Sequence, residues 1–132
     1  MCQLKTVLAF IEKEIEINVD TTIIGHSIGT LVAVRLGEGH AYHKMILIAG
    51  WDFNDLCEGH IKFWETPIDH ATIRKNVKEI YVVLSDNDPY YTKIQAEDMC
   101  KRLGGTSVFV PGAGHFTEKD GASKIPKLLE IT

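Results

Sequence analysis

The sequence predicts an α/β fold in which a parallel β-sheet is covered by helices on both faces, in three layers. Short apolar runs alternate along the chain with longer segments of helical periodicity, and the connections between them are short. Strands that alternate with helices in this way form parallel sheets with right-handed crossovers. The 132 residues are enough for one core, so we expect a single domain over residues 1–132 with about four strands.

The first half of the chain contains two predicted helices and two predicted strands. Residues 3–17 place apolar side chains at spacings of three and four, as on one face of a helix. A strand over 21–25 follows and passes directly into a helix over 28–36, which Gly37 ends. The apolar run 43–50 closes with a glycine and is typical of a strand that is covered on both faces.

The second half continues the alternation. Asp69 is placed to cap a short helix that ends at Asn76. The remaining elements are a third strand, a helix, a fourth strand and a last helix, over residues 79–84, 90–103, 106–110 and 123–131.

Residues 51–67 mix aromatic and acidic side chains without a sustained period, which predicts a loop that caps the sheet. The loop follows the carboxyl end of a strand, where α/β sheets bind ligands. Trp51 and Phe53 are therefore candidates for lining an acyl or leaving-group pocket. The alternative is that Trp51 and Trp64 only cover the edge of the sheet.

The strongest chemical signal is Gly25-His26-Ser27-Ile28-Gly29, which lies between a predicted strand and a predicted helix. In this context Gly-x-Ser-x-Gly indicates a nucleophile elbow, a sharp turn that exposes the serine Oγ. We expect both glycines to be needed, because neither has a Cβ that would collide with the neighbouring helix and strand. The Ile28 N–H can face a developing oxyanion, and we interpret His26 as a packing or hydrogen-bonding residue.

A serine nucleophile needs a histidine that takes its proton and an acid that orients the histidine. His115 is the predicted base, because it lies in a glycine-rich loop after the fourth strand. The other histidines considered lie in polar surroundings or near the wrong strand ends: His40, His43, His60 and His70. Asp86 and Asp88 follow the third strand, and both are candidates for the acid, since an Asn-Asp-Pro sequence is also ordinary turn chemistry.

These segments resemble the small α/β-hydrolase-fold serine hydrolases of the retinoblastoma-binding protein 9 type over nearly the whole chain. The resemblance rests on the elbow, on residues 85–90, on Gly114-His115-Phe116, and on Pro67-Ile68-Asp69 and Ile73-Arg74 between them. It implies that Ser27 is the nucleophile, that Asp88 just before the proline is the acid, and that His115 is the base. It also implies that Asp86 is a neighbouring turn residue and that a large cap domain is lacking.

The chain departs from the family pattern at its start. Family members begin with a further strand ending in His-Gly and a loop that donates a second oxyanion N–H, whereas this chain opens at the helix before the elbow strand. The resemblance therefore implies that residues 21–25 lie at an uncovered apolar edge. This points to a fragment, to a misassigned start, or to an edge covered by a second copy or another chain. Losing one oxyanion donor costs about 2.7–4 kcal/mol, so a triad would still work weakly.

Composition narrows the expected partners and compartment. The formal net charge of −4 and the scattered Lys and Arg residues provide no basic surface for nucleic acid or for an anionic membrane. Cys2, Cys57 and Cys100 are widely spaced, so neither a disulfide framework nor a thiolate zinc site is expected. With no signal-peptide run and no stretch of about eighteen apolar residues, the sequence predicts a cytoplasmic protein.

The predicted function is a carboxylesterase-like serine hydrolase that cleaves small ester, thioester or activated amide substrates. It uses Ser27, His115 and Asp88, with an acyl-enzyme intermediate and the Ile28 N–H at the oxyanion, and it needs no metal or cofactor. The alternative is a hydrolase-like protein-binding module that is catalytically weak or inactive. The complete triad favours the first function, and the absent N-terminal parts favour the second.

Overall fold

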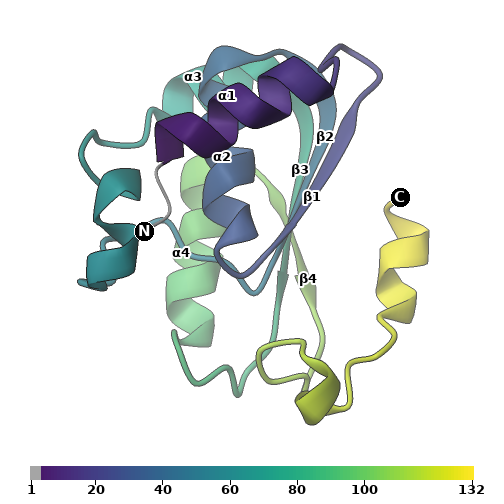
Figure 1. Ribbon diagram of the computed structural model, residues 1–132. Coiled ribbons are helices and arrows are strands. Elements are labelled where there is room, and N and C mark those ends of the chain that lie inside the picture. The colour runs from purple at the N-terminus through teal and green to yellow at the C-terminus, as the bar shows by residue number, and fades with distance from the viewer. Residues whose placement is uncertain (1–3) are drawn as a thin grey trace.

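The computed structural model describes residues 4–132 and has the predicted α/β architecture (Figure 1). Four parallel strands form one sheet in the order β1-β2-β3-β4, so that each strand pairs with the next one in the chain. The strands are β1 (Thr22–His26), β2 (Tyr42–Ile48), β3 (Val77–Leu84) and β4 (Thr106–Phe109). All four strands predicted from the sequence are present, with boundaries that differ by a few residues.

The longer helices lie against one face of this sheet (Figure 1). They are α2 (Gly29–Gly39), α3 (His70–Asn76) and α4 (Lys93–Leu103), and α1 (Leu4–Glu14) lies outside α2. The topology explains this arrangement, because right-handed crossovers that always step to the next strand in the same direction place every connecting helix on the same face. The opposite face is covered by the C-terminal segment, which contains the 3₁₀ turns η2 (Glu118–Asp120) and η3 (Pro126–Glu130).

The predicted last α-helix over 123–131 is wrong, because the segment forms only the short turn η3. Its apolar residues Ile125, Leu128 and Ile131 are spaced by three, which matches the period of a 3₁₀ helix and places all three on one side. They pack against the second face of the sheet. Pro126, which has no amide hydrogen, begins the turn.

The central strand β2 is covered on both faces, as the sequence predicts. Met45 and Leu47 pack into the core beneath α2, α3 and α4, whereas Ile46 and Ile48 pack beneath the C-terminal segment. All four side chains are buried. The larger core lies on the helical face, and the core under the C-terminal segment is smaller.

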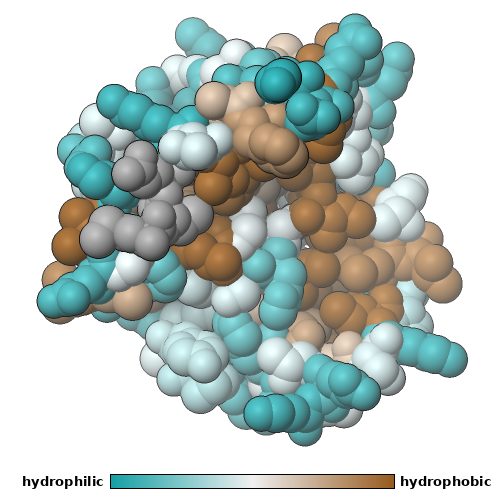
Figure 2. Space-filling model, in the orientation of Figure 1, coloured by the Kyte–Doolittle hydropathy of each residue, from teal (hydrophilic) through white to brown (hydrophobic). Residues whose placement is uncertain are grey.

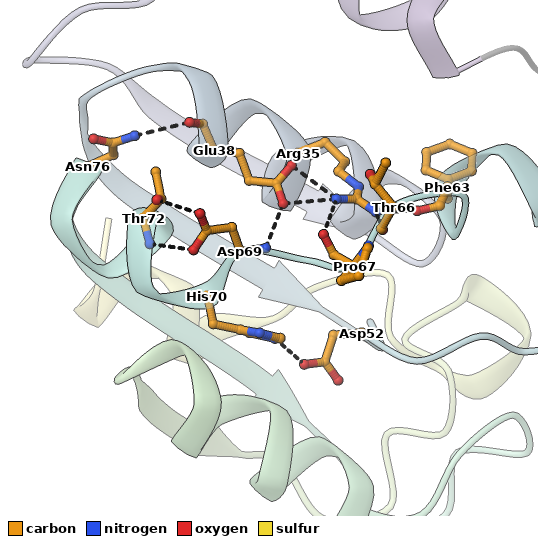
Figure 3. A network of polar contacts seen from close by, with 10 residues as sticks. All are labelled: Arg35, Glu38, Asp52, Phe63, Thr66, Pro67, Asp69, His70, Thr72 and Asn76. Carbon is orange, nitrogen blue, oxygen red and sulfur yellow. Dashed lines mark hydrogen bonds and ion pairs between the residues drawn. The ribbon is translucent and has the colours of Figure 1, made fainter.

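The loop that follows β2 contains one 3₁₀ turn, η1 (Glu58–Phe63), and a buried arginine fastens it to α2 (Figure 3). Arg35 donates hydrogen bonds to the carbonyl oxygens of Phe63 and Thr66, each at 2.5 Å. The guanidinium also pairs with Glu38 at 2.8 Å. Because a buried charge is tolerated only when it is paired and hydrogen-bonded, this network holds the end of the loop against the helix.

The beginning of the same loop is fastened by Asp52, whose carboxylate is fully buried. Its oxygens pair with His70 of α3 at 2.8 Å and with Arg102 of α4 at 2.6 Å (Figure 3 shows the contact with His70). The hydrogen bond from Arg102 to Asp52 raises the pKa of that guanidinium. The loop is therefore tied to three helices.

The opposite border of the molecule is open. β1 is an edge strand, and no described residue pairs with its outer side. Ile24 is 51% exposed, and none of the residues of α1 is buried. An apolar groove of about 480 Å³ lies between α1 and β1. Figure 2, in the orientation of Figure 1, shows apolar side chains gathered on the face of the molecule that is in view. The uncovered edge expected from the sequence is thus present in residues 4–132.

Candidate active site

Ser27 lies on a sharp turn between β1, which ends at His26, and α2, which begins at Gly29. Its φ is 54°, in the left-handed region that non-glycine residues rarely adopt. Two hydrogen bonds hold the turn: the Ser27 N–H donates to the Ile48 carbonyl at 3.0 Å, and the Thr30 hydroxyl donates to the Ser27 carbonyl at 2.6 Å. This is the geometry of a nucleophile elbow.

The two glycines of the motif are not equivalent. A Cβ at Gly25 would lie 2.6 Å from the carbonyl oxygen of Gly29, so the backbone of the turn leaves no room for a side chain there. A Cβ at Gly29 would meet no atom within 4 Å. The expectation that both positions need glycine is therefore correct for Gly25 and wrong for Gly29, because the first residue of α2 faces open space.

The structure brings Ser27, His115 and Asp88 together, although they follow three different strands. The Nε2 of His115 lies 2.8 Å from the Ser27 Oγ, and its Nδ1 lies 2.8 Å from the Asp88 Oδ2. The Asp88 carboxylate is fully buried and the His115 ring is 11% exposed. Since a carboxylate only accepts, Nδ1 carries the proton and Nε2 is free to accept the hydrogen of the Ser27 hydroxyl.

The turn after β3 also distinguishes the two candidate acids. Asp86 accepts a hydrogen bond from the Gly112 N–H at 2.8 Å, and the oxygen that lies next to His115 belongs to Asp88. Ser85 donates to the Gly114 carbonyl at 2.5 Å, and the Asn87 side chain accepts from the Gly114 N–H at 2.7 Å. Four consecutive residues of one loop therefore hold the loop that carries His115.

Further contacts fix His115 from its other sides. The His26 Nε2 lies 2.8 Å from the His115 carbonyl oxygen, which accepts its proton, so the expectation that His26 is a hydrogen-bonding residue is confirmed. Asp120 accepts from the His115 N–H at 3.0 Å, and its pKa is lowered by hydrogen bonds from Thr117 and then from His115. Gly114 has a φ of 56°, and a Cβ there would lie 2.6 Å from the Asp120 carboxyl carbon.

Comparison with known proteins agrees with this geometry. Residues 2–131 match the family model described as serine hydrolase. The chain belongs to the serine hydrolase family. It is 29% identical over 111 residues to a protein named serine hydrolase RBBP9 from Rattus norvegicus. That match covers 83% of this chain and 60% of the relative, so the chain spans less than two thirds of that relative's length.

Solved structures show the same fold. The ydeN gene product from B. subtilis superimposes with a TM-score of 0.79 at 20% identity, over 97% of this chain and 70% of that one. A putative YdeN-like hydrolase from Pectobacterium atrosepticum superimposes with a TM-score of 0.71 at 20% identity, over 99% of this chain and 68% of that one. The resemblance stated from the sequence motifs is confirmed.

A pocket of about 600 Å³ opens beside Ser27 and His115. Trp51 and Phe53 line it, as expected from their position after β2. Trp51 is 7% exposed and belongs mainly to the core, so its ring both covers the sheet and forms a wall of the pocket. Trp64 packs against the core without lining the pocket.

Sequence reasoning missed several lining residues. Asp55, Cys57, His60 and Tyr90 all face the same pocket. Sequence reasoning sets His60 aside with the histidines in polar surroundings or near the wrong strand ends, whereas in the structure it lines the pocket together with Ser27. A signal for these residues was present in the sequence, because loops that follow strand ends line the ligand crevice of α/β sheets. The rule was applied to the aromatic residues of this loop and also holds for the polar residues beside them.

The backbone beside Ser27 offers one donor to the pocket. The Ile28 N–H precedes α2, and none of the hydrogen bonds found within residues 4–132 uses it. It therefore remains available, and the positive end of the α2 dipole lies there.

Tyr91 lies near the Asp88 carboxylate. Burial and then this carboxylate raise the pKa of Tyr91, so its phenol keeps its proton.

Within residues 4–132 no group of three or more His, Cys, Asp or Glu residues is arranged to hold a metal ion. No helix in this range combines the length and apolar character that crossing a bilayer requires.

Proposed function

We propose that this chain hydrolyses small ester, thioester or activated amide substrates through Ser27, His115 and Asp88, with an acyl-enzyme intermediate. The observation that carries the proposal is the continuous pair of 2.8 Å contacts from the Ser27 Oγ to the His115 ring and from that ring to the buried Asp88 carboxylate. This arrangement allows a neutral histidine to accept a proton while its orientation is held.

In the acylation step, the Ser27 Oγ attacks the substrate carbonyl carbon and its proton passes to the His115 Nε2. Asp88 stabilises the charged ring through the hydrogen bond at Nδ1. The negatively charged oxygen of the tetrahedral intermediate accepts a hydrogen bond from the Ile28 N–H. When the intermediate collapses, the bond to the leaving group breaks and His115 returns the proton to that group.

In the deacylation step, water enters the place of the leaving group. The His115 Nε2 takes a proton from this water as the water oxygen attacks the acyl carbon. The second tetrahedral intermediate collapses, His115 protonates the Ser27 Oγ, and the carboxylic acid leaves. The free enzyme is restored without any other reactant.

The test is reaction with a fluorophosphonate probe followed by intact-mass measurement and peptide mapping. We expect a single adduct on Ser27, absent from Ser27→Ala and retained in Ser123→Ala, which changes an exposed serine that is not among the residues lining the pocket. The same samples should show loss of p-nitrophenyl ester hydrolysis in Ser27→Ala only. An adduct on another serine contradicts the proposal.

The second candidate function is a protein-binding module that does not turn over. It is supported by the donors found for the oxyanion, because only the Ile28 N–H is identified within residues 4–132 and each donor of this kind is worth about 10²–10³ in turnover. A folded sample that neither reacts with the probe nor cleaves esters favours the module over the hydrolase.

A further inference from the structure

The pocket holds a second aspartate–histidine pair in addition to Asp88 and His115. The Nδ1 of His60 lies 2.5 Å from the Asp55 Oδ2, and both residues line the pocket beside Ser27. The side chains are 26% and 20% exposed, respectively. The proposed mechanism uses neither of them, and neither is needed to hold the elbow or the loop of His115.

The contacts of Asp55 determine which nitrogen of His60 is free. The other oxygen of Asp55 accepts a hydrogen bond from the Cys57 N–H at 3.2 Å, so both carboxylate oxygens have a partner. Because a carboxylate can only accept, the neutral His60 ring carries its proton on Nδ1. No hydrogen bond within the described residues uses Nε2. In the neutral ring the free nitrogen is therefore an acceptor.

Ring contacts hold His60 in place on one wall of the pocket. Its centroid lies 5.9 Å from that of Trp51 and 6.5 Å from that of Phe63, edge on. His115 is in contact with a different set of rings, those of Tyr90 at 4.6 Å and His26 at 5.3 Å. The pocket thus has one wall around His115 and another around His60.

These two walls correspond to the two parts of a substrate. The leaving group must lie near His115, because the Nε2 of this ring delivers its proton. The acyl part then extends toward the Trp51 and His60 wall. No Lys or Arg is among the residues that line this pocket in the described chain, so nothing in the lining attracts an anionic acyl group.

We propose that Asp55 and His60 form an acyl-group subsite in which the His60 Nε2 accepts a hydrogen bond from a neutral donor on the substrate, an amide N–H or a hydroxyl. The inference rests on the proposed function and adds a substrate class to it: acyl groups that combine an apolar stem, packed on Trp51 and Phe53, with one hydrogen-bond donor. Asp55 is a positioning residue that fixes the tautomer and orientation of His60.

The test compares p-nitrophenyl esters whose acyl chains, of several matched lengths, end in a primary amide or in a methyl ketone. The two groups have nearly the same shape, but only the amide donates. For the chain length that reaches His60, we expect kcat/KM to favour the amide roughly fivefold, the effect of one neutral hydrogen bond. A chain that ends in a carboxylate should be the poorest of the three substrates.

Variants connect this preference to His60. His60→Phe should abolish the preference for the amide over the ketone, and His60→Gln, whose side-chain oxygen can accept, should keep part of it. Asp55→Asn should weaken it, because an amide can donate to Nδ1 and so favour the other tautomer. The matched control is His43→Gln, which changes a histidine that pairs with Glu79 outside the pocket and should leave the ratio as it is.

A ratio near one at every chain length in the unmodified protein, or a ratio that survives in His60→Phe, overturns the subsite while ester hydrolysis and labelling of Ser27 stand. If no ester is cleaved, the proposed function fails and the subsite is judged by binding. For this test the p-nitrophenyl ester of each compound is replaced by a ketone that cannot be hydrolysed, and the far end of the chain stays an amide or a methyl ketone. These compounds are titrated into Ser27→Ala, and binding is followed by tryptophan fluorescence. Equal Kd values for the amide and ketone ends overturn the subsite in that case too.

Discussion

The two borders of the sheet are built very differently. Beside β3 and β4, each of the four side chains of residues 85–88 makes a hydrogen bond with the loop 112–115, Ser85 as a donor and the other three as acceptors. At the β1 border, α1 has no buried residue, and the outer side of the strand has no partner in the described chain. His115 and Asp88 thus come from the densely bonded border, and Ser27 comes from the open one.

This difference shows how a precise site can exist next to a poorly covered edge. Ser27 lies at the carboxyl end of β1, where its N–H bonds to β2 and its turn packs against α2. The open groove runs along α1 and the outer side of β1 instead. Changes at the dense border should therefore affect chemistry or folding strongly, and changes at the open border should mainly affect association.

The largest expected effect is on turnover, at the dense border. Asp88→Asn should lower kcat for a p-nitrophenyl ester by roughly 10⁴-fold, because an amide in this position favours the wrong tautomer of His115. Steady-state kinetics on the folded variant measures the effect, and circular dichroism verifies the fold.

Asp86→Asn is the matched control, since this side chain holds the Gly112 N–H and an amide oxygen can still accept it. We expect a change in kcat of less than about tenfold, the cost of weakening one such bond. A larger loss in Asp86→Asn than in Asp88→Asn would show that Asp86 is the acid. It would also contradict the family pattern at this turn.

The next effect is on stability and compares the two borders directly. Leu103 of α4 is fully buried, so Leu103→Ala should lower the free energy of unfolding by about 2–5 kcal/mol. Phe10 of α1 is 64% exposed, and Phe10→Ala should change it by no more than about 0.5 kcal/mol. Urea denaturation of both variants gives the two values, and similar losses would show that α1 is as tightly packed as α4.

A smaller effect separates the glycines of the elbow. Gly25→Ala should destabilise the fold by about 1–3 kcal/mol, because its Cβ would meet the backbone of Gly29. Gly29→Ala should be neutral or stabilise the fold by up to about 1 kcal/mol, since its Cβ enters open space in a helix. Thermal unfolding distinguishes them, and equal melting temperatures would mean that the turn relaxes around Gly25.

The smallest energetic effect concerns the open border. We propose that two copies pair through β1, because an edge strand with exposed apolar side chains is a template for another strand. Sedimentation velocity should show association that increases with concentration and is reduced in Ile24→Lys. The control is Ile94→Lys, which changes a residue of α4 that is 68% exposed, more than the 51% of Ile24. The pairing is contradicted if the protein is a monomer at every concentration and if its melting temperature equals that of a version extended by an upstream strand.

Much of the architecture follows from local patterns in the sequence. The four strands, the three connecting helices and the elbow at Ser27 are each determined by residues close together in the chain: an apolar run, a helical period, a cap at Asp69, or a glycine pair around a serine. The sequence also identified His115 and two aspartates, because each follows the end of a strand and parallel strands bring such ends to one edge.

What only the tertiary structure decided is which side chains meet. Asp86 and Asp88 are indistinguishable as turn residues, and the choice between them depends on which oxygen lies next to a ring 27 residues away. His60 came into the pocket because Arg35 and Asp52 fold its loop back over the sheet. The C-terminal segment forms η3 because this turn places three apolar side chains, spaced by three residues, against the sheet. These outcomes depend on contacts between distant segments, which no local period or spacing encodes.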